Sequence, residues 1–268
     1  MTSSGGQGRV RLDVLLTDRG LFETRSKSAA AVLAGDVFIG PGRERASKPG
    51  QSVAEDVVLE VSDTKRFVSR GGIKLDNALT TLGIDVSGLR CLDIGASTGG
   101  FTDCLLQRGA SSVIALDVAY GELAWSLRQD PRVHVMERAN ARDLELSDLP
   151  WQPDFVVCDV SFIAVAKIMA AVARVLPDGT DGVLLVKPQF EVGRDAVGKG
   201  GVVRDSAVRR QALILAGDSA LSEGLGPIGF ASSELPGPKG NRETFIHVRK
   251  GAESSSGRLL AMAEVAEP

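Results

Sequence analysis

The stretch CLDIGASTGGFTD, residues 91–103, decides the fold. Its apolar start is typical of a buried strand, and Gly95, Gly99 and Gly100 would allow a tight turn whose backbone closely approaches a ligand before a helix begins. The spacing is Gly-x-x-x-Gly-Gly, whereas the turn that binds a pyrophosphate has Gly-x-Gly-x-x-Gly. Asp93, which we place inside the turn, would repel a diphosphate, so the turn suits a cationic or zwitterionic cofactor.

Strand-like runs alternate with helical segments from residue 90 onward. The pattern predicts strands at 91–95, 112–117, 133–137, 155–160, 182–186, 228–233 and 244–248. It predicts helices at 101–108, 121–128, 163–176 and 205–223, with a last short helix after residue 257. This alternation indicates a doubly wound α/β sheet. Seven strands, of which the last two form an antiparallel pair, suit a methyltransferase sheet better than a two-halved dinucleotide fold.

The stretch GVLLVKPQFEVG, residues 182–193, ends an apolar run with a cation. A continuous aliphatic run is typical of a central parallel strand covered by helices on both faces, and ligands of such folds bind beyond the carboxyl ends of the strands. Lys187 is therefore a candidate site residue. Asp159 ends the preceding strand, so the two side chains should meet, either in an active site or as a buried salt bridge.

Polar residues also follow the other predicted strands. Asp117 ends the second strand, where a carboxylate can accept hydrogen bonds from both ribose hydroxyls of an adenosine. Its alternative role is to cap a helix. After the third strand, NARDL places Asn140 and Asp143 near the adenine edge. With Asp93, these positions favour S-adenosylmethionine over a nicotinamide cofactor.

The first 61 residues have a pattern of their own. Apolar positions at helical spacing predict a helix from Val10 that ends at Gly20, and a second helix covers 26–34. Two strand-like pieces, 36–40 and 57–61, flank a turn-rich segment. Basic residues recur along the helices and the turn, where they could follow a phosphate backbone or simply be solvated: Arg9, Arg11, Arg25, Lys27, Arg43, Arg45 and Lys48.

This small module resembles the S4-type RNA-binding domain. The resemblance rests on RLDVLL, the Gly20 turn, Arg25, GDVFIG and KPG, and it spans residues 9 to about 61. It implies docking on structured RNA through the second helix and the following turn. The sequence departs from the family pattern at Thr24, where a serine is usual. We expect an S4-type domain at 1–61, a linker at 62–71 and a catalytic domain at 72–268.

The whole chain resembles the TlyA (hemolysin A) family. The motifs, in the expected order, are SRGGIKL, LDIGASTGGFTD, DVSFI, VKPQFEVG, GKGGVVRD and GNRE. The resemblance implies a small α+β S4-type domain followed by an FtsJ-like, Rossmann-like class I S-adenosylmethionine-dependent methyltransferase. The implied reaction is ribose 2′-O-methylation of a cytidine in ribosomal RNA, in the large subunit, with the small subunit as a further candidate. Phe67 stands where the family often has a tryptophan.

The resemblance assigns a catalytic tetrad to Lys74, Asp159, Lys187 and Glu243. We expect the cofactor to contact Asp93, Gly95, Ser97, Gly99, Gly100, Phe101, Asp117, Asn140 and Asp159. We expect RNA to contact Arg9, Arg11, Arg25, Lys27, Arg43, Lys48 and Arg70. The long glycine-rich segment 189–205 is predicted to be a loop that closes over the substrate, with Arg194, Lys199 and Arg204 able to reach phosphates.

Methyl transfer to a ribose hydroxyl requires removal of a weakly acidic proton. A lysine can serve as the base only if its pKa falls toward neutrality. We assign Lys187 as the base and Asp159 as the group that orients it, with Lys74 and Glu243 holding the hydroxyl. The sequence does not separate a true base from a cation that only positions the oxygen.

Composition excludes some alternatives. The chain has 268 residues, 43% of them hydrophobic, and a net charge of −3, which argues against indiscriminate nucleic-acid binding. The three cysteines fit buried hydrophobic positions, and two distant histidines do not suggest a metal site. No apolar run is long enough to span a membrane, and the start lacks the apolar core of a signal peptide. We expect a cytoplasmic, metal-free monomer acting on ribosomal subunits.

Three alternatives remain open at the level of sequence. A nicotinamide oxidoreductase could use the same sheet, although Asp93 and the glycine spacing argue against it. A membrane-active, hemolysin-like protein would need an amphipathic helix with a lysine-rich face, and none stands out. An RNA-binding protein with an inactive methyltransferase domain is disfavoured because the expected residue types occupy all four tetrad positions and the cofactor loop.

Overall fold

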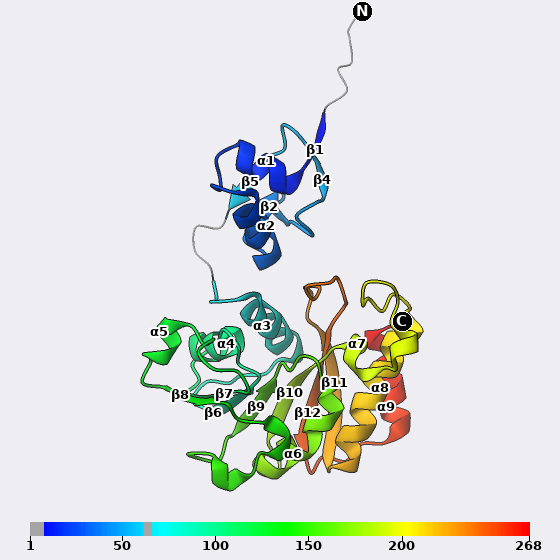
Figure 1. Ribbon diagram of the computed structural model, residues 1–268. Coiled ribbons are helices and arrows are strands. Elements are labelled where there is room, and N and C mark those ends of the chain that lie inside the picture. Colours follow the sequence, from blue (N-terminus) through cyan, green and yellow to red (C-terminus); the bar gives the residue numbers. More distant parts are fainter. Residues whose placement is uncertain (1–7, 62–65) are drawn as a thin grey trace, which may run out of the picture. The chain divides into compact units, whose positions relative to one another are not determined.

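The computed structural model describes residues 8–61 and 66–268. Residues 1–7 of the predicted first domain and residues 62–65 of the predicted linker lie outside the described residues. The chain divides into two compact units, residues 1–70 and 71–268 (Figure 1).

The small unit combines short strands with two helices. Its elements among the described residues are β1 (Arg9–Arg11), α1 (Leu12–Asp18), α2 (Arg25–Ala34), β2 (Val37–Ile39), β3 (Glu44–Arg45), β4 (Ser52–Ala54) and β5 (Leu59–Val61). β1 pairs with β4, and β2 lies between β3 and β5; all these pairs are antiparallel. The two strand-like pieces predicted at 36–40 and 57–61 therefore pair as β2 and β5.

Local signals explain the helices of this unit. The Thr24 hydroxyl accepts a hydrogen bond from the backbone N–H of Lys27 at 3.2 Å and caps α2, so threonine performs the capping role here. Leu12 and Leu16 of α1 are fully buried. The first helix begins at Leu12 and not at Val10, because Val10 pairs with Val53 between β1 and β4.

The rest of the chain alternates strands and helices as predicted. In chain order the elements are α3 (Arg70–Leu82), β6 (Arg90–Ile94), α4 (Gly100–Gln107), β7 (Ser112–Asp117), α5 (Trp125–Arg128), β8 (Val133–Glu137), η1 (Ala141–Asp143), η2 (Leu146–Asp148), β9 (Phe155–Cys158), η3 (Val165–Ile168), α6 (Met169–Val175), β10 (Asp181–Val186), α7 (Pro188–Glu191), η4 (Arg194–Ala196), α8 (Ser206–Ser222), β11 (Leu225–Ser232), β12 (Thr244–Lys250) and α9 (Ser256–Ala266).

Seven of these strands form one sheet, which confirms the predicted fold. The strand order is β11-β12-β10-β9-β6-β7-β8. The five strands from β10 to β8 are parallel, whereas β12 is antiparallel to both β10 and β11. The chain runs outward from β6 in one direction and from β9 in the other, so a crevice is expected beyond the carboxyl ends of these two strands.

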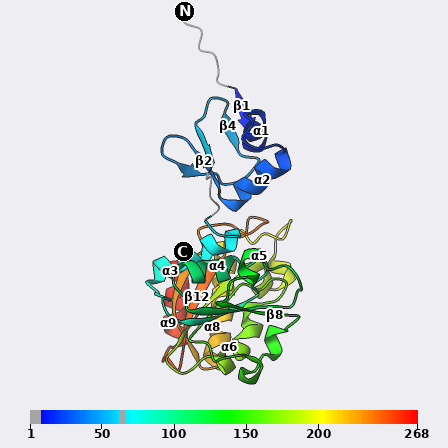
Figure 2. The same ribbon diagram turned by 90° about the vertical axis from the view of Figure 1, so that its left-hand side faces the viewer.

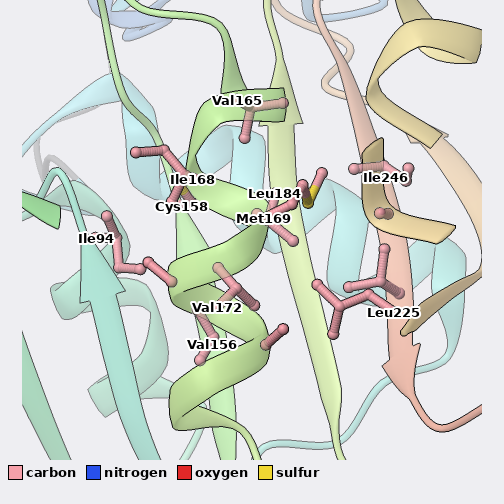
Figure 3. Packing of buried hydrophobic residues seen from close by; sticks show 14 of the residues in the cluster. Ile94, Val156, Cys158, Val165, Ile168, Met169, Val172, Leu184, Leu225 and Ile246 are labelled. Atoms are coloured by element: carbon pink, nitrogen blue, oxygen red, sulfur yellow. The ribbon is translucent and has the colours of Figure 1, made fainter. Parts of the chain in front are cut away.

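Helices cover both faces of the sheet. On one face, Val156 of β9 and Leu184 of β10 pack with Met169 and Val172 from α6 in a cluster of fully buried side chains (Figure 3). On the other face, Phe101 of α4 lies 5.8 Å from Phe245 of β12 between ring centroids. Burial on both faces explains why the central strands read as unbroken apolar runs.

Two predicted segments differ from the structure. The helix predicted at 121–128 is only the four-residue α5, because Gly121 adopts a left-handed φ of 81° and the preceding residues line a cleft. The segment 189–205, predicted as a loop, begins inside α7 and contains η4. Pro188 at the first helical position favours the short α7.

Candidate active site

A cleft of about 1220 Å³ opens at the carboxyl ends of the parallel strands. Its walls come from the segments that follow β6, β7, β8, β9 and β10, all within the large unit. Ligand pockets usually measure about 300–1000 Å³. The cleft therefore has room for a cofactor and for part of a second substrate.

The glycine loop after β6 forms one wall of this cleft. Gly95 has a φ of 83°, and a Cβ on it would lie 2.6 Å from the backbone oxygen of Asp159. The loop is tied to β7, since the N–H groups of Gly95 and Ala96 both donate to the Leu116 carbonyl. Only glycine allows this close approach between the β6 and β9 segments.

We expect Gly95→Ala to weaken cofactor binding at least about tenfold, because the added methyl group would push the Asp159 backbone out of the cleft wall. Isothermal titration with S-adenosylmethionine measures the effect. Gly83→Ala is the matched control, since Gly83 has a similar left-handed φ of 66° but no neighbour within 4 Å. Equal affinities for the two variants would show that the close approach at Gly95 does not matter.

Asp117 lies at the end of β7 with its carboxylate fixed by backbone amides. Its two oxygens accept hydrogen bonds from Ser97 N and Ala119 N, each at 2.8 Å. Asp117, Ser97 and Glu122 all line the cleft, and Ser97 adopts a left-handed φ of 47° that turns the loop toward Asp117. The predicted ribose-binding carboxylate is therefore held facing the cleft.

The predicted position of Asp93 in the turn is wrong. Asp93 lies inside β6 and is fully buried, and its Oδ2 accepts a hydrogen bond from the Thr102 hydroxyl at 2.7 Å. Burial raises the pKa of Asp93 to about 7, with Asp159 and Asp117 as further negative neighbours, while Thr102 opposes the rise. Its Oδ1 has no hydrogen-bond partner among the described residues. A cationic group bound nearby would favour its ionised form.

The remaining cofactor candidates differ in whether they line the cleft. Asn140 lines the cleft and caps η1, accepting from Arg142 N at 3.2 Å. The side chain of Phe101 is buried against Phe245, and Phe101 is not among the residues that line the cleft. Gly99, with a φ of 96°, and Gly100 begin that helix. In sequence, a hydrophobic residue beside the loop looks the same whether it faces the cleft or the core.

The four tetrad candidates form two ion pairs. Lys187 Nζ lies 2.5 Å from Asp159 Oδ1 and donates to Ser161 Oγ at 2.7 Å. Lys74 of α3 pairs with Glu243, and both side chains are buried. The pairing of β10 with β12 ends at Val186 and Thr244. Lys187 follows Val186 and Glu243 precedes Thr244, so each of the two ion pairs has one residue at this end of the paired strands.

Two phenylalanines, Phe162 and Phe190, line the cleft. The Phe162 side chain is 93% exposed, and its backbone has a left-handed φ of 67°. Its ring centroid lies 5.8 Å from that of Phe190, and both residues line the cleft. A strained backbone that holds an aromatic ring in solvent is unusual outside functional sites.

Glu191 joins two segments of the cleft wall, a role that the sequence does not predict. Its Oε1 accepts a hydrogen bond from Val165 N at 2.6 Å, which ties the segment after β10 to the segment after β9. Burial raises the pKa of Glu191 to about 7, and the N–H groups of Val165 and Ala166 oppose the rise. Its place in the KPQFE motif was the available signal, but the motif did not show which way the side chain points.

The candidate RNA-binding residues of the small unit are exposed: Arg9, Arg11, Arg25, Lys27, Arg43 and Lys48. Arg11 and Arg25 both bind the carboxylate of Asp13, at 2.8 and 3.0 Å. The hydrogen bond from Arg11 holds the pKa of Asp13 at about 2, although burial opposes it. One buried carboxylate thus fixes two guanidinium groups side by side. Arg70 is half-buried at the start of α3.

A family model described as FtsJ-like methyltransferase matches residues 67–250. The chain is 46% identical over 243 residues, 90% of each protein, to the 16S/23S rRNA (cytidine-2′-O)-methyltransferase TlyA of Mycobacterium tuberculosis. The chain belongs to the TlyA family of FtsJ-like methyltransferases. Hemolysin A of Brachyspira hyodysenteriae, a further TlyA-family relative, is 40% identical over 239 residues, 89% of this chain and 99% of that protein.

A solved structure supports the same TlyA-family membership. A protein from Streptococcus thermophilus, described as a possible hemolysin, matches with a TM-score of 0.73 and 39% identity over 97% of this chain and 96% of the other. Across the described residues, no helix is long and apolar enough to cross a membrane.

Proposed function

We propose that this TlyA-family methyltransferase transfers a methyl group from S-adenosylmethionine to the ribose 2′-hydroxyl of a cytidine in ribosomal RNA. The observation that carries the proposal is the Lys187–Asp159 pair, which adjoins a cleft large enough for a cofactor and a nucleotide. The 46% identity to a ribosomal RNA cytidine methyltransferase supports the choice of substrate. Such a substrate would place the protein in the cytoplasm, and we propose a metal-free monomer.

The residues in and around the glycine loop fit the cofactor. Gly95 lets the backbone approach closely, Asp117 presents a fixed carboxylate to ribose hydroxyls, and Asn140 lies farther along the same wall. Asp93 is buried, its Oδ1 has no hydrogen-bond partner in the part of the chain that the structure describes, and it supplies negative charge behind the loop. When bound, S-adenosylmethionine supplies an electrophilic methyl group on a positively charged sulfur.

Lys187 is the group that acts on the hydroxyl. Its ammonium is held by Asp159 and Ser161, and both of these residues line the cleft. In this position Lys187 can hold the ribose oxygen and, if it is first deprotonated, accept the proton that leaves it. The Lys74–Glu243 pair, on the neighbouring strand end, holds the other side of the hydroxyl.

The aromatic pair at the cleft supports an RNA substrate. Enzymes that act on one nucleotide take it out of its stack, and aromatic rings receive unstacked bases. Phe162 presents such a ring to solvent next to Asp159. The small unit, which we propose to be an S4-type RNA-binding domain, would supply affinity for the surrounding RNA through the cations around Asp13.

The function is tested by tritiated methyl transfer to ribosomal subunits that lack the modification, followed by mapping of ribose methylation. We expect label at a cytidine 2′-oxygen of one or both subunits. Isolated RNA without ribosomal structure and protein without cofactor are the controls. Cofactor binding without label on either subunit would refute the ribosomal substrate.

A further inference from the structure

Two loops of the large unit are fastened together by one buried asparagine. The first, residues 198–205, precedes α8, and the second, residues 233–243, joins β11 to β12; both rise from the same end of the sheet (Figures 1 and 2). Asn241 is 2% exposed. Its Oδ1 accepts from Val203 N at 2.9 Å, and its Nδ2 donates to the Gly201 carbonyl at 2.8 Å. The Asn241 side chain therefore joins the two loops.

The joined loops carry four exposed cations: Lys199, Arg204, Lys239 and Arg242. Among the described residues, none of the four forms an ion pair with an acidic side chain. Lys239 lies against the other loop, since its Nζ is 3.7 Å from where a Cβ on Gly201 would be. Two acidic residues of the loops have partners other than these cations: Asp205 caps α8, and Glu243 pairs with Lys74. Glu234 is the remaining acid and is exposed.

The loop that bears Lys239 and Arg242 adjoins Glu243 of the tetrad. The loop that bears Lys239 folds onto Glu243, since a Cβ on Gly237 would lie 2.3 Å from Glu243 Oε1, and the Gly237 N–H donates to the Asn241 carbonyl at 2.8 Å. Arg242 directly precedes Glu243. A chain with a net charge of −3 that binds RNA must concentrate positive charge where phosphates lie.

We propose that Lys199, Arg204, Lys239 and Arg242, held in place by Asn241, form a binding site for the phosphodiester backbone of the nucleotides that flank the methylated ribose. This inference rests on the proposed function. All four cations belong to the large unit, and their task is to hold the target strand against the Lys187 and Glu243 strand ends. Binding here affects the strand to be methylated, whereas cofactor binding does not depend on it.

The test compares full-length wild type with the double variant Lys239→Ala/Arg242→Ala and with Arg258→Ala. Arg258 is an exposed cation in α9, and the segment before α9 binds the start of β11, at the opposite end of the sheet. Binding to unmodified ribosomal subunits is measured at several salt concentrations without cofactor. S-adenosylmethionine affinity, measured in parallel, reports on whether each variant is folded.

We expect the double variant to bind subunits about tenfold more weakly at physiological salt. The slope of log affinity against log salt should fall by about 0.7–0.9 for each lost phosphate contact. Arg258→Ala and cofactor affinity should match wild type. A double variant with unchanged affinity and slope would overturn the site. Because binding is measured without turnover, wild type that binds subunits but transfers no methyl group refutes the proposed reaction and leaves the phosphate site standing.

Discussion

Lys187→Ala should lower kcat for methyl transfer by about 10²–10⁴-fold while leaving S-adenosylmethionine affinity within about twofold of wild type. Among the described residues, the Lys187 side chain contacts Asp159 and Ser161, which both line the cleft. Lys187 itself is not one of the residues that line the cleft, so its loss should not disturb the cofactor. Single-turnover transfer at saturating cofactor measures the chemical step. A variant that retains more than about a tenth of the wild-type rate would remove Lys187 from the reaction.

Lys187→Arg separates the two roles that the sequence left open. Arginine keeps a positive charge that can pair with Asp159, but it cannot be deprotonated in a protein. If Lys187 is the base, the arginine variant should be as inactive as the alanine variant. If Lys187 only holds the oxygen by its charge, the arginine variant should recover a large part of the rate, and the assignment as base would be wrong.

The sequence was sufficient for the fold and for the Lys187–Asp159 pair. Aliphatic runs that are buried on both faces appear as continuous strands, and adjacent parallel strands must present their carboxyl ends together. The structure accordingly places Lys187 Nζ at 2.5 Å from Asp159. The sequence also predicted the glycine loop. Once β6 and β9 are neighbours, the backbone at residue 95 lies so close to the Asp159 backbone that only glycine fits.

The sequence was insufficient where a side chain could face either of two directions. Asp93 and Phe101 adjoin the loop in sequence, but Asp93 lies on β6, which is buried on both faces, and Phe101 packs against Phe245. Asn241 carries no local signal at all, because its partners lie about 40 residues earlier in the chain. The pairing of Lys74 with Glu243 also depends on contacts across most of the large unit, and only the family resemblance brought the two residues together in advance.

Lys74→Ala should lower the free energy of unfolding of the large unit by about 3–5 kcal/mol, because it leaves Glu243 buried without its partner. Both tryptophans, Trp125 and Trp151, belong to this unit, so their fluorescence during urea denaturation reports on it and not on the small unit. Loss of activity in this variant alone would not distinguish a role in the reaction from loss of structure.

The double variant Lys74→Met/Glu243→Leu makes that distinction. Replacing a buried ion pair by apolar side chains of similar size is often neutral or stabilising, so the free energy of unfolding should return to within about 1 kcal/mol of wild type. If the pair holds the ribose hydroxyl, methyl transfer should remain at least about 10²-fold below wild type in this stable protein, with cofactor affinity unchanged. Recovery of activity together with stability would mean that the pair only supports the strand ends, and that Lys187 and Asp159 alone act on the hydroxyl.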